Sequence, residues 1–408
     1  MRVGKTLLLT VFSISAFGCS NPTEPINQTV TTIGDSIKIV TPLPTFPSSY
    51  ENFKAYVLPP LLSNNSIVPS CERNGYRHPT SNGRGYADFL QNGTITLVDA
   101  VIGPPMGSHT DPSIICFWKR NNSGQWIDIT ETFMTDNRGC VGGANKSLIA
   151  DFNRDGRPDI FFLCTGPKWN ANGSVLTHQP GGISFWLVSQ PDGKYRTQHM
   201  NYSAYAHGGS AGDINSDGYP DVVFSNGGVI VVNGQRQEQY LTVLLNDKNG
   251  GFLRRDDIIT IPDSLRHQSI NAVELIDVDD DGLLDILVAN GDYRTFILWG
   301  DKNGTFPNTR PPTRLPFSQP ESNYNGTHNF HKIGRFLYAW NVTKPNNSNE
   351  TGNSLERISI DTWQVETIWQ RTELYKIEGW GSVDSWGQIR LYGGKFIHDF
   401  VLGLTIDP

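Results

Sequence analysis

Three nine-residue segments carry oxygen-bearing side chains at one shared spacing. They read DFNRDGRPD from residue 151, DINSDGYPD from residue 213 and DVDDDGLLD from residue 277. A carboxylate or amide oxygen falls at positions 1, 3, 5 and 9, and the glycine at position 6 permits a sharp turn. This donor set suits a hard cation with about six to eight oxygen ligands, such as Ca²⁺, to which the main-chain carbonyl at position 7 adds one more oxygen.

The three segments therefore predict three calcium sites. The expected ligand residues are Asp151, Asn153, Asp155, Arg157 and Asp159 in the first loop, Asp213, Asn215, Asp217, Tyr219 and Asp221 in the second, and Asp277, Asp279, Asp281, Leu283 and Asp285 in the third. The third loop has four ligand carboxylates where the others have three, so we expect it to bind calcium most tightly. Calcium that binds the folded loops better than the unfolded chain would stabilise the fold, which gives the ions a structural role.

Two alternatives share the opening residues of these loops. An EF-hand needs a bidentate glutamate at position 12 and a helix on each side, whereas position 12 here is Phe162, Phe224 or Val288. A turn rich in Asp and Asn without a metal is the other alternative. It would leave three or four carboxylates in each loop to repel one another, which favours the calcium interpretation.

Each loop lies between two strand-like segments. Leu148–Ala150 precedes the first loop and Ile160–Leu163 follows it. A second repeated segment, at Val243–Phe252 and Ile297–Phe306, consists of an apolar run, a glycine-containing turn and an aromatic residue that opens the next strand. This pattern is typical of a hairpin, so each repeat predicts two hairpins, or four strands.

This combination of loop and hairpin resembles the FG-GAP/VCBS repeat family, whose calcium-loop blades also form the propeller of integrin alpha subunits. The resemblance is clearest over residues 146–311, and a copy that lacks the ligand set begins at Tyr86. It implies an all-β fold, a β-propeller of four-stranded blades over residues 51–408. Radial closure protects strand edges that a single blade would expose. We favour seven blades, with six as the alternative.

The chain begins with features of an export signal. Residues 1–18 combine the basic Arg2 and Lys5 with an apolar stretch, which is typical of a signal peptide. The cysteine that follows, Cys19, resembles the acylated cysteine of bacterial lipoproteins, which implies a lipidated Cys19 and, with Ser20 after it, a lipoprotein of the outer membrane in the cell envelope. A secreted protein is the alternative. Residues 19–50 are polar and rich in Thr and Pro, and predict a flexible tether.

The remaining four cysteines fit an exported protein. Cys71, Cys116, Cys140 and Cys164 allow two disulfides in three connectivities. We favour Cys140 with Cys164, because these two bracket a predicted hairpin, and then Cys71 with Cys116. No C-x-x-C spacing is present that would indicate zinc.

Composition excludes several kinds of partner. The 408 residues, 37% of them hydrophobic, are enough for a large folded domain. The net charge of -7 and the lack of a basic stripe argue against nucleic acid. After residue 18 no apolar run approaches the ~20 residues that a membrane-spanning helix needs, so we expect membrane contact through the lipid alone, and a monomer.

Other residue groups give weaker indications of function. Gly208–Gly212 matches G-x-S-x-G around Ser210, but a nucleophile elbow needs a helix after the serine and the calcium loop follows at once. The pairs His328 with His331 and His109 with Asp111 have no recognisable partner group, so we predict no catalytic residue. Exposed tryptophans near the C-terminus could stack on a glycan: Trp363, Trp369, Trp380 and Trp386.

The predicted function is therefore non-catalytic binding or adhesion, with a glycan or a protein as ligand. The expected protein is a calcium-stabilised propeller in the cell envelope that holds its ligand with the loops at one rim. The alternative is an enzyme active on polysaccharides, a lyase or hydrolase, with its site in the propeller funnel. A third option is an assembly factor in an envelope complex, which would expose a broad apolar patch.

Overall fold

The computed structural model describes most of the chain between residues 83 and 371. Outside that range it describes the strands at 30–33, 36–39, 382–383, 389–390, 397–399 and 404–406. Inside it, the residues not described are 84, 93–95, 102–111, 124, 142, 167–180, 227–228, 233–234, 239–240, 262–269, 291–294, 319–323 and 344–351. The predicted signal peptide, Cys19 and Cys71 therefore lie outside the described residues. In the part that is described, no helix has the length and apolar character that a membrane crossing requires.

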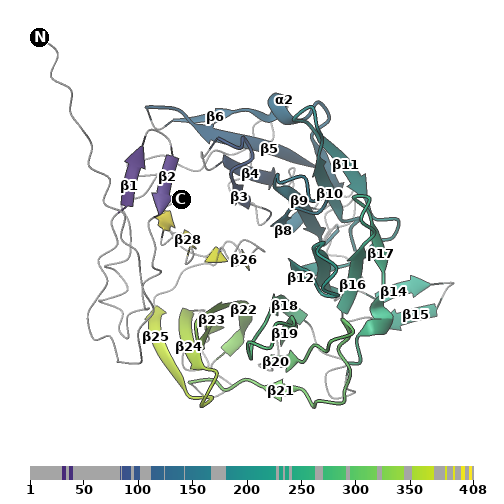
Figure 1. Ribbon diagram of the computed structural model, residues 1–408, viewed down its shortest axis with the longest axis vertical. Coiled ribbons are helices and arrows are strands. Elements are labelled where there is room, and N and C mark those ends of the chain that lie inside the picture. The colour runs from purple at the N-terminus through teal and green to yellow at the C-terminus, as the bar shows by residue number, and fades with distance from the viewer. Residues whose placement is uncertain are drawn as a thin grey trace, which may run out of the picture.

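Five antiparallel sheets follow one another along the chain (Figure 1). The first consists of β3 (Gly85–Ala87), β4 (Thr96–Val101), β5 (Pro112–Arg120) and β6 (Trp126–Asp128), with β7 (Arg138–Val141) also paired to β5. The second consists of β8 (Ala144–Ala150), β9 (Asp159–Cys164), β10 (Phe185–Ser189) and β11 (Tyr195–His199). A short helix, α2 (Thr130–Phe133), lies between β6 and β7.

The next three sheets repeat the same strand order. The third consists of β12 (Ala206–Gly212), β13 (Asp221–Asn226), β16 (Leu241–Asn246) and β17 (Phe252–Arg254). The fourth consists of β18 (Ile270–Ile276), β19 (Asp285–Asn290), β20 (Thr295–Leu298) and β21 (Thr313–Arg314). The fifth consists of β22 (Tyr324–Ile333), β23 (Phe336–Thr343), β24 (Gly352–Ser359) and β25 (Val365–Arg371).

Insertions and short strand pairs complete the described elements. A hairpin of β14 (Val229–Val232) and β15 (Gln235–Glu238) is inserted between β13 and β16, and a single 3-10 turn (Asp256–Ile258) follows β17. The other pairs are β1 (Val30–Ile33) with β2 (Ser36–Ile39), β26 (Ser382–Val383) with β27 (Ile389–Arg390), and β28 (Ile397–Asp399) with β29 (Leu404–Ile406). The pair β1 and β2 interrupts the segment predicted as a tether, since the β-branched residues of Val30–Ile33 suit a strand.

The five sheets stand side by side around a common axis. The first strand of each sheet contacts the first strand of the next, in the order β3, β8, β12, β18, β22, and the later strands lie progressively farther out (Figure 1). This is the all-β propeller of four-stranded blades that the sequence predicts. The number of blades, seven or six, stays a prediction, because the remaining described strands form only isolated pairs.

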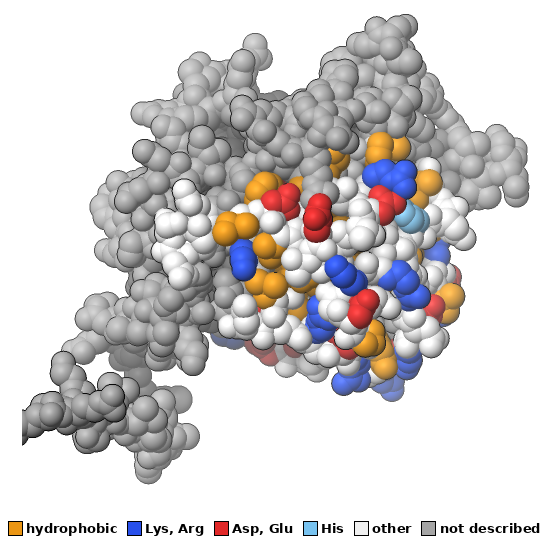
Figure 2. Space-filling model, turned by 90° about the horizontal axis from the view of Figure 1, so that it is seen from above, with side chains coloured by type: hydrophobic (Ala, Val, Ile, Leu, Met, Phe, Trp, Pro, Cys, Tyr) orange, Lys and Arg blue, Asp and Glu red, His pale blue; other side chains and the backbone are white. Residues whose placement is uncertain are grey.

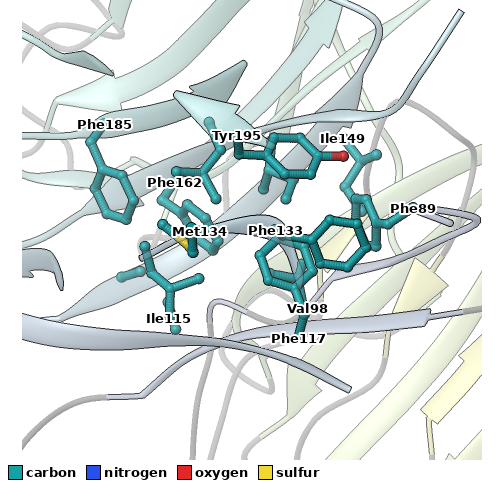
Figure 3. Packing of buried hydrophobic residues seen from close by; sticks show 14 of the residues in the cluster. Phe89, Val98, Ile115, Phe117, Phe133, Met134, Ile149, Phe162, Phe185 and Tyr195 are labelled. Carbon is teal, nitrogen blue, oxygen red and sulfur yellow. The ribbon is translucent and has the colours of Figure 1, made fainter. Parts of the chain in front are cut away.

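The hydrophobic core lies between neighbouring sheets. One cluster joins the first two sheets and brings Phe89, Phe117, Phe133 and Tyr195 together (Figure 3). Three further clusters join the second sheet to the third, the third to the fourth, and the fourth to the fifth. Strands covered on both faces carry apolar residues at successive positions, and all six residues of β9 are buried. Packing between blades therefore fixes where each connecting loop lies.

A disulfide links the first two sheets. Cys140 in β7 is bonded to Cys164 at the end of β9, which confirms the favoured pairing. Cys116 in β5 is also disulfide-bonded. Its expected partner, Cys71, lies outside the described residues, so that pairing stays a prediction.

Candidate metal centre

The three acidic loops occupy equivalent places in the second, third and fourth sheets. Each connects the first strand to the second, between β8 and β9, β12 and β13, and β18 and β19. The carboxylate of Asp151 at position 1 accepts hydrogen bonds from the main-chain N–H groups of Asp155 and Gly156, at 3.0 and 2.8 Å. Asp213 and Asp277 accept the equivalent bonds at 2.7 to 3.1 Å. The three loops therefore share one turn geometry.

Backbone conformation explains two of the loop positions. The glycine at position 6 has φ of 82, 89 and 85° in the three loops, a left-handed region that glycine enters without steric cost. Position 4 also has positive φ, at 58° for Arg154, 57° for Ser216 and 64° for Asp280. These two left-handed residues bend the chain sharply within the loop.

The aspartate at position 9 anchors each loop to its blade. Asp159 accepts the N–H of Phe152 on one oxygen, at 2.8 Å, and the N–H of Ser189 on the other, at 2.7 Å. Ser189 is the last residue of the third strand, β10. Asp221 and Asp285 accept the equivalent pairs of bonds at 2.7 to 2.9 Å; the donors are Asn246 at the end of the third strand, β16, and Gly300, two residues after the third strand, β20. Oδ2 of Asp159 also accepts the N–H of Asn153 at 3.2 Å, whereas its Oδ1 keeps acceptor capacity for a cation beyond the bond from Ser189.

These anchoring carboxylates are costly to ionise in the protein alone. Asp159, Asp221 and Asp285 are at most 2% exposed. Burial raises the pKa of each to about 7, an effect that the hydrogen bonds from the main chain only partly oppose. A bound divalent cation would favour the ionised form.

The third loop brings three carboxylates together. Oxygens of Asp277, Asp279 and Asp285 lie within 4.8 Å of one another, a separation at which one cation can contact all three. Oδ1 of Asp279 is buried and has no hydrogen-bond partner. A buried carboxylate oxygen without a partner is unfavourable unless a cation or donor meets it, so this loop fits a metal ion.

Position 5 and its surroundings differ between the loops. Asp155 accepts the side-chain N–H of Asn153 at 3.1 Å and the hydroxyl of Ser189 at 2.6 Å. Asp217 accepts the equivalent amide bond, from Asn215, at 3.1 Å and lies 3.2 Å from Nζ of Lys248. In the third loop the ion pair is at position 3, where Nη1 of Arg310 lies 2.6 Å from Oδ2 of Asp279.

Side chains at positions 4 and 7 lie apart from the predicted ligand oxygens. The guanidinium of Arg157 donates to the carbonyls of Gln190 and Gly193. The predicted calcium ligand at position 7 is therefore the main-chain carbonyl of Arg157, as expected for this position. Asp280 pairs with Lys332 and Arg335, and hydrogen bonds from these two cations lower its pKa. Tyr219 and Leu283 donate their main-chain N–H groups to the aspartate at position 5.

Some contributors to the site were missed by the sequence analysis. Ser189, Asn246 and Gly300 donate to the anchoring aspartates, and the repeated apolar run of the hairpin segment, which ends at these residues, was a signal for them. No comparable signal marked Arg310, which is 31 residues from Asp279. Its place depends on how the fourth sheet folds.

The other sequence indications are mostly structural. Ser210 is a buried residue of β12 that pairs with Val223, so it lies in a strand and not on a nucleophile elbow. Trp186 stacks on Phe161, and its indole N–H donates to the carbonyl of Gly250. Trp363 packs against the core between the fourth and fifth sheets. His109, Asp111, Trp380 and Trp386 lie outside the described residues.

An ion pair crosses the inner strands. Nζ of Lys146 in β8 lies 2.6 Å from Oε1 of Glu274 in β18, and the two side chains are 5% and 2% exposed. Beside it, the amide of Asn145 donates to the carbonyl of His207 in β12 at 2.5 Å. Polar groups from three successive blades therefore meet near the axis, and the two charges neutralise each other.

Comparisons with known proteins give no family. No family model matches the chain, and no curated protein matches it. Among solved structures, the chain is similar to the polysaccharide lyase Uly1 at 13% identity and a TM-score of 0.36, with 73% of this chain and 64% of that one covered. It thus spans less than two thirds of that lyase.

Two other solved structures are similar at the same level. The periplasmic gluconolactonase PpgL of Pseudomonas aeruginosa is 14% identical with a TM-score of 0.39, over 77% of this chain and 80% of that one. BT0996, in a complex with RGII, is 10% identical with a TM-score of 0.34, over 68% of this protein and 88% of that one. Similarity at this level does not extend to an activity.

Proposed function

We propose that the protein is a calcium-stabilised β-propeller of the FG-GAP/VCBS type that binds a glycan or a protein ligand without catalysis. The observation that carries the calcium role is the oxygen cluster of Asp277, Asp279 and Asp285, together with the turn geometry that this loop shares with the other two. A bound ion would neutralise the carboxylates of a loop and hold the first strand of its blade to the second.

The calcium role is tested by calorimetric titration of the chelated protein. Three binding events are expected, one for each loop. A protein shown to be free of metal that takes up no calcium would contradict the proposal. Magnesium is the control ion, since it requires a nearly ideal octahedral site and keeps several waters.

The axis of the ring favours binding over catalysis. Two of the titratable groups near the axis, Lys146 and Glu274, are paired with each other and almost completely buried. A general acid or base must reach the substrate, and this pair has no exposed face to offer. The ligand would then be held by surface loops, as in other scaffolds whose function depends on loops.

A polysaccharide lyase or hydrolase is the second candidate. The observation in its favour is that polar groups from three blades converge on the axis. A glycan array with and without calcium, followed by measurement of product release from every polysaccharide bound, separates the two functions. Binding without turnover supports the binding module, and product release that requires the folded protein would establish the enzyme.

An assembly factor is supported less well. On the face seen in Figure 2, hydrophobic side chains form separate groups among Lys, Arg, Asp and Glu. Among the described residues, the large hydrophobic side chains with substantial exposure are Ile127, Leu253 and Phe336, which come from three different sheets, and Ile183, which lies just before β10. A docking surface for an obligate partner is usually a larger continuous apolar area.

Attachment to the envelope forms part of the proposal. A lipid on Cys19 would hold the propeller at the outer membrane, on its periplasmic side or at the cell surface. Mass spectrometry of the mature N-terminus tests this. An acylated Cys19 supports the anchor, and an unmodified N-terminus elsewhere would indicate a secreted protein.

A further inference from the structure

We infer that Arg310 is a resident cation of the third loop, which competes with calcium for Asp279 and makes this loop the weakest of the three calcium sites. The inference rests on the proposed calcium role of the loops. It reverses the order expected from counting carboxylates, by which the third loop would bind most tightly.

The position of Arg310 is well defined. Its Nη1 lies 2.6 Å from Oδ2 of Asp279, a charge-assisted hydrogen bond. Its guanidinium carbon lies 3.3 Å from the centre of the Trp299 ring, so the cation also stacks on an aromatic face. Trp299 directly follows β20 of the same sheet, and these two contacts together hold the guanidinium against the loop.

The carboxylate that Arg310 engages is one of the three that would hold the metal. Oδ2 of Asp279 bonds the guanidinium, while Oδ1 is buried without a hydrogen-bond partner. A calcium ion at the cluster would add two positive charges beside the guanidinium, and the two cations would repel each other. Calcium must therefore either displace Arg310 from Asp279 or bind against its charge, and both lower the affinity of the site.

The cation at the second loop is held less closely than Arg310. Lys248 lies 3.2 Å from Asp217 and 5.7 Å from the centre of the Tyr219 ring, whereas Arg310 makes the corresponding contacts at 2.6 and 3.3 Å; the two side chains are 51% and 50% exposed, so distance and stacking separate them, not exposure. In the first loop the guanidinium of Arg157 is bonded to main-chain carbonyls. Among the described residues, no ion pair reaches a ligand carboxylate of the first loop. The expected order of calcium affinity is therefore first loop, second loop, third loop.

Two more cations reinforce the charge around the third loop. Lys332 and Arg335 of the fifth sheet pair with Asp280, and Lys332 also donates to the carbonyl of Asp277. Asp280 stands at position 4 and is not a predicted ligand. The third loop thus has more carboxylates than the others, but cations supplied by its own chain already neutralise two of them.

Calcium titration of the full chain after chelation tests the inference. The binding event lost in Asp281→Ala identifies the third loop. Arg310→Gln should raise the calcium affinity of that event by roughly two- to fivefold, as expected for removal of a half-exposed ion pair. Arg310→Lys keeps the charge and should leave the affinity near the wild-type value. Arg255→Gln, which breaks an exposed pair with Asp257, is the matched control and should change nothing.

Melting temperature gives a second measurement that distinguishes competition from a purely structural role. Arg310→Gln removes a counter-ion, so the melting temperature of the calcium-free protein should fall, while that of the calcium-saturated protein should change less. An equal fall in both states, or an unchanged affinity at the third loop, would overturn the role of Arg310. A wild-type protein that binds no calcium at all would instead overturn the proposed function on which this inference rests.

Discussion

The buried ion pair between Lys146 and Glu274 offers the sharpest test of how the ring is held together. The pair joins β8 of the second sheet to β18 of the fourth, across the sheet that stands between them. With side chains 5% and 2% exposed and a 2.6 Å contact, neither charge has water as an alternative partner. Removal of one partner takes away the opposite charge that balances the other at 2.6 Å inside the protein.

The expected cost follows from this burial. Lys146→Met or Glu274→Leu alone should lower the free energy of unfolding by about 3–5 kcal/mol, the range for breaking a buried pair. The double variant Lys146→Met/Glu274→Leu should recover most of that loss, because two apolar side chains of similar volume leave no charge unpaired. Arg255→Met, which breaks an ion pair exposed to solvent, should change the free energy of unfolding far less than either single variant.

Equilibrium denaturation in urea, with saturating calcium, measures all four variants under one condition. The coupling energy of the double-mutant cycle isolates the pair itself. A loss below about 1 kcal/mol in both single variants would refute the reasoning, because it would place the pair in contact with water. The axis would then be open to solvent, and the enzyme alternative would gain support.

Three further predictions concern the calcium loops. Chelation should lower the melting temperature, which calorimetry measures. One site at a calcium concentration of 100 times its dissociation constant stabilises the folded protein by about 2.7 kcal/mol. An unchanged melting curve in protein shown to be metal-free would contradict structural calcium. The rise in melting temperature on calcium binding should shrink in Asp281→Ala but not in Asp280→Ala. Loss of the pairs from Asp280 to Lys332 and Arg335 should lower the melting temperature equally with and without calcium. An equal loss of the calcium effect in both variants would contradict the ligand assignment. Because burial raises the pKa of Asp285 and its two counterparts to about 7, the calcium-free folded state holds more protons than the unfolded state between about pH 4 and 7. Its stability should therefore fall as pH rises through that window, and urea denaturation at several pH values would show no such fall if these carboxylates were solvated.

The loops themselves were predictable because their geometry is local. The bonds from Asp277 to the N–H groups four and five residues later depend on the glycine at position 6 and on short, contiguous sequence. Strand boundaries around the loops followed from apolar runs, and the disulfide between Cys140 and Cys164 followed from the hairpin between them. The fold class was predictable for the same reason, since each repeat encodes its own four strands.

The surroundings of the loops could not be predicted in this way. The donors to the anchoring aspartates lie 15 to 30 residues further along, and the repeat only hinted at them. Counting carboxylates took no account of Arg310, because sequence alone did not reveal that it folds back onto Asp279 over Trp299. The charge of a loop depends on every cation within contact, and not on its own residues alone.

The amino-acid sequence by itself determined the turn chemistry of the three loops and the alternation of strands that builds each blade, because both arise from interactions within about ten residues. The tertiary structure alone decided which charges meet. Lys146 and Glu274 are 128 residues apart, and Lys332 is 52 residues from Asp280. Such contacts exist only once the blades have packed side by side around the axis, since the packing of one sheet against the next sets the distance between groups that are remote in the chain.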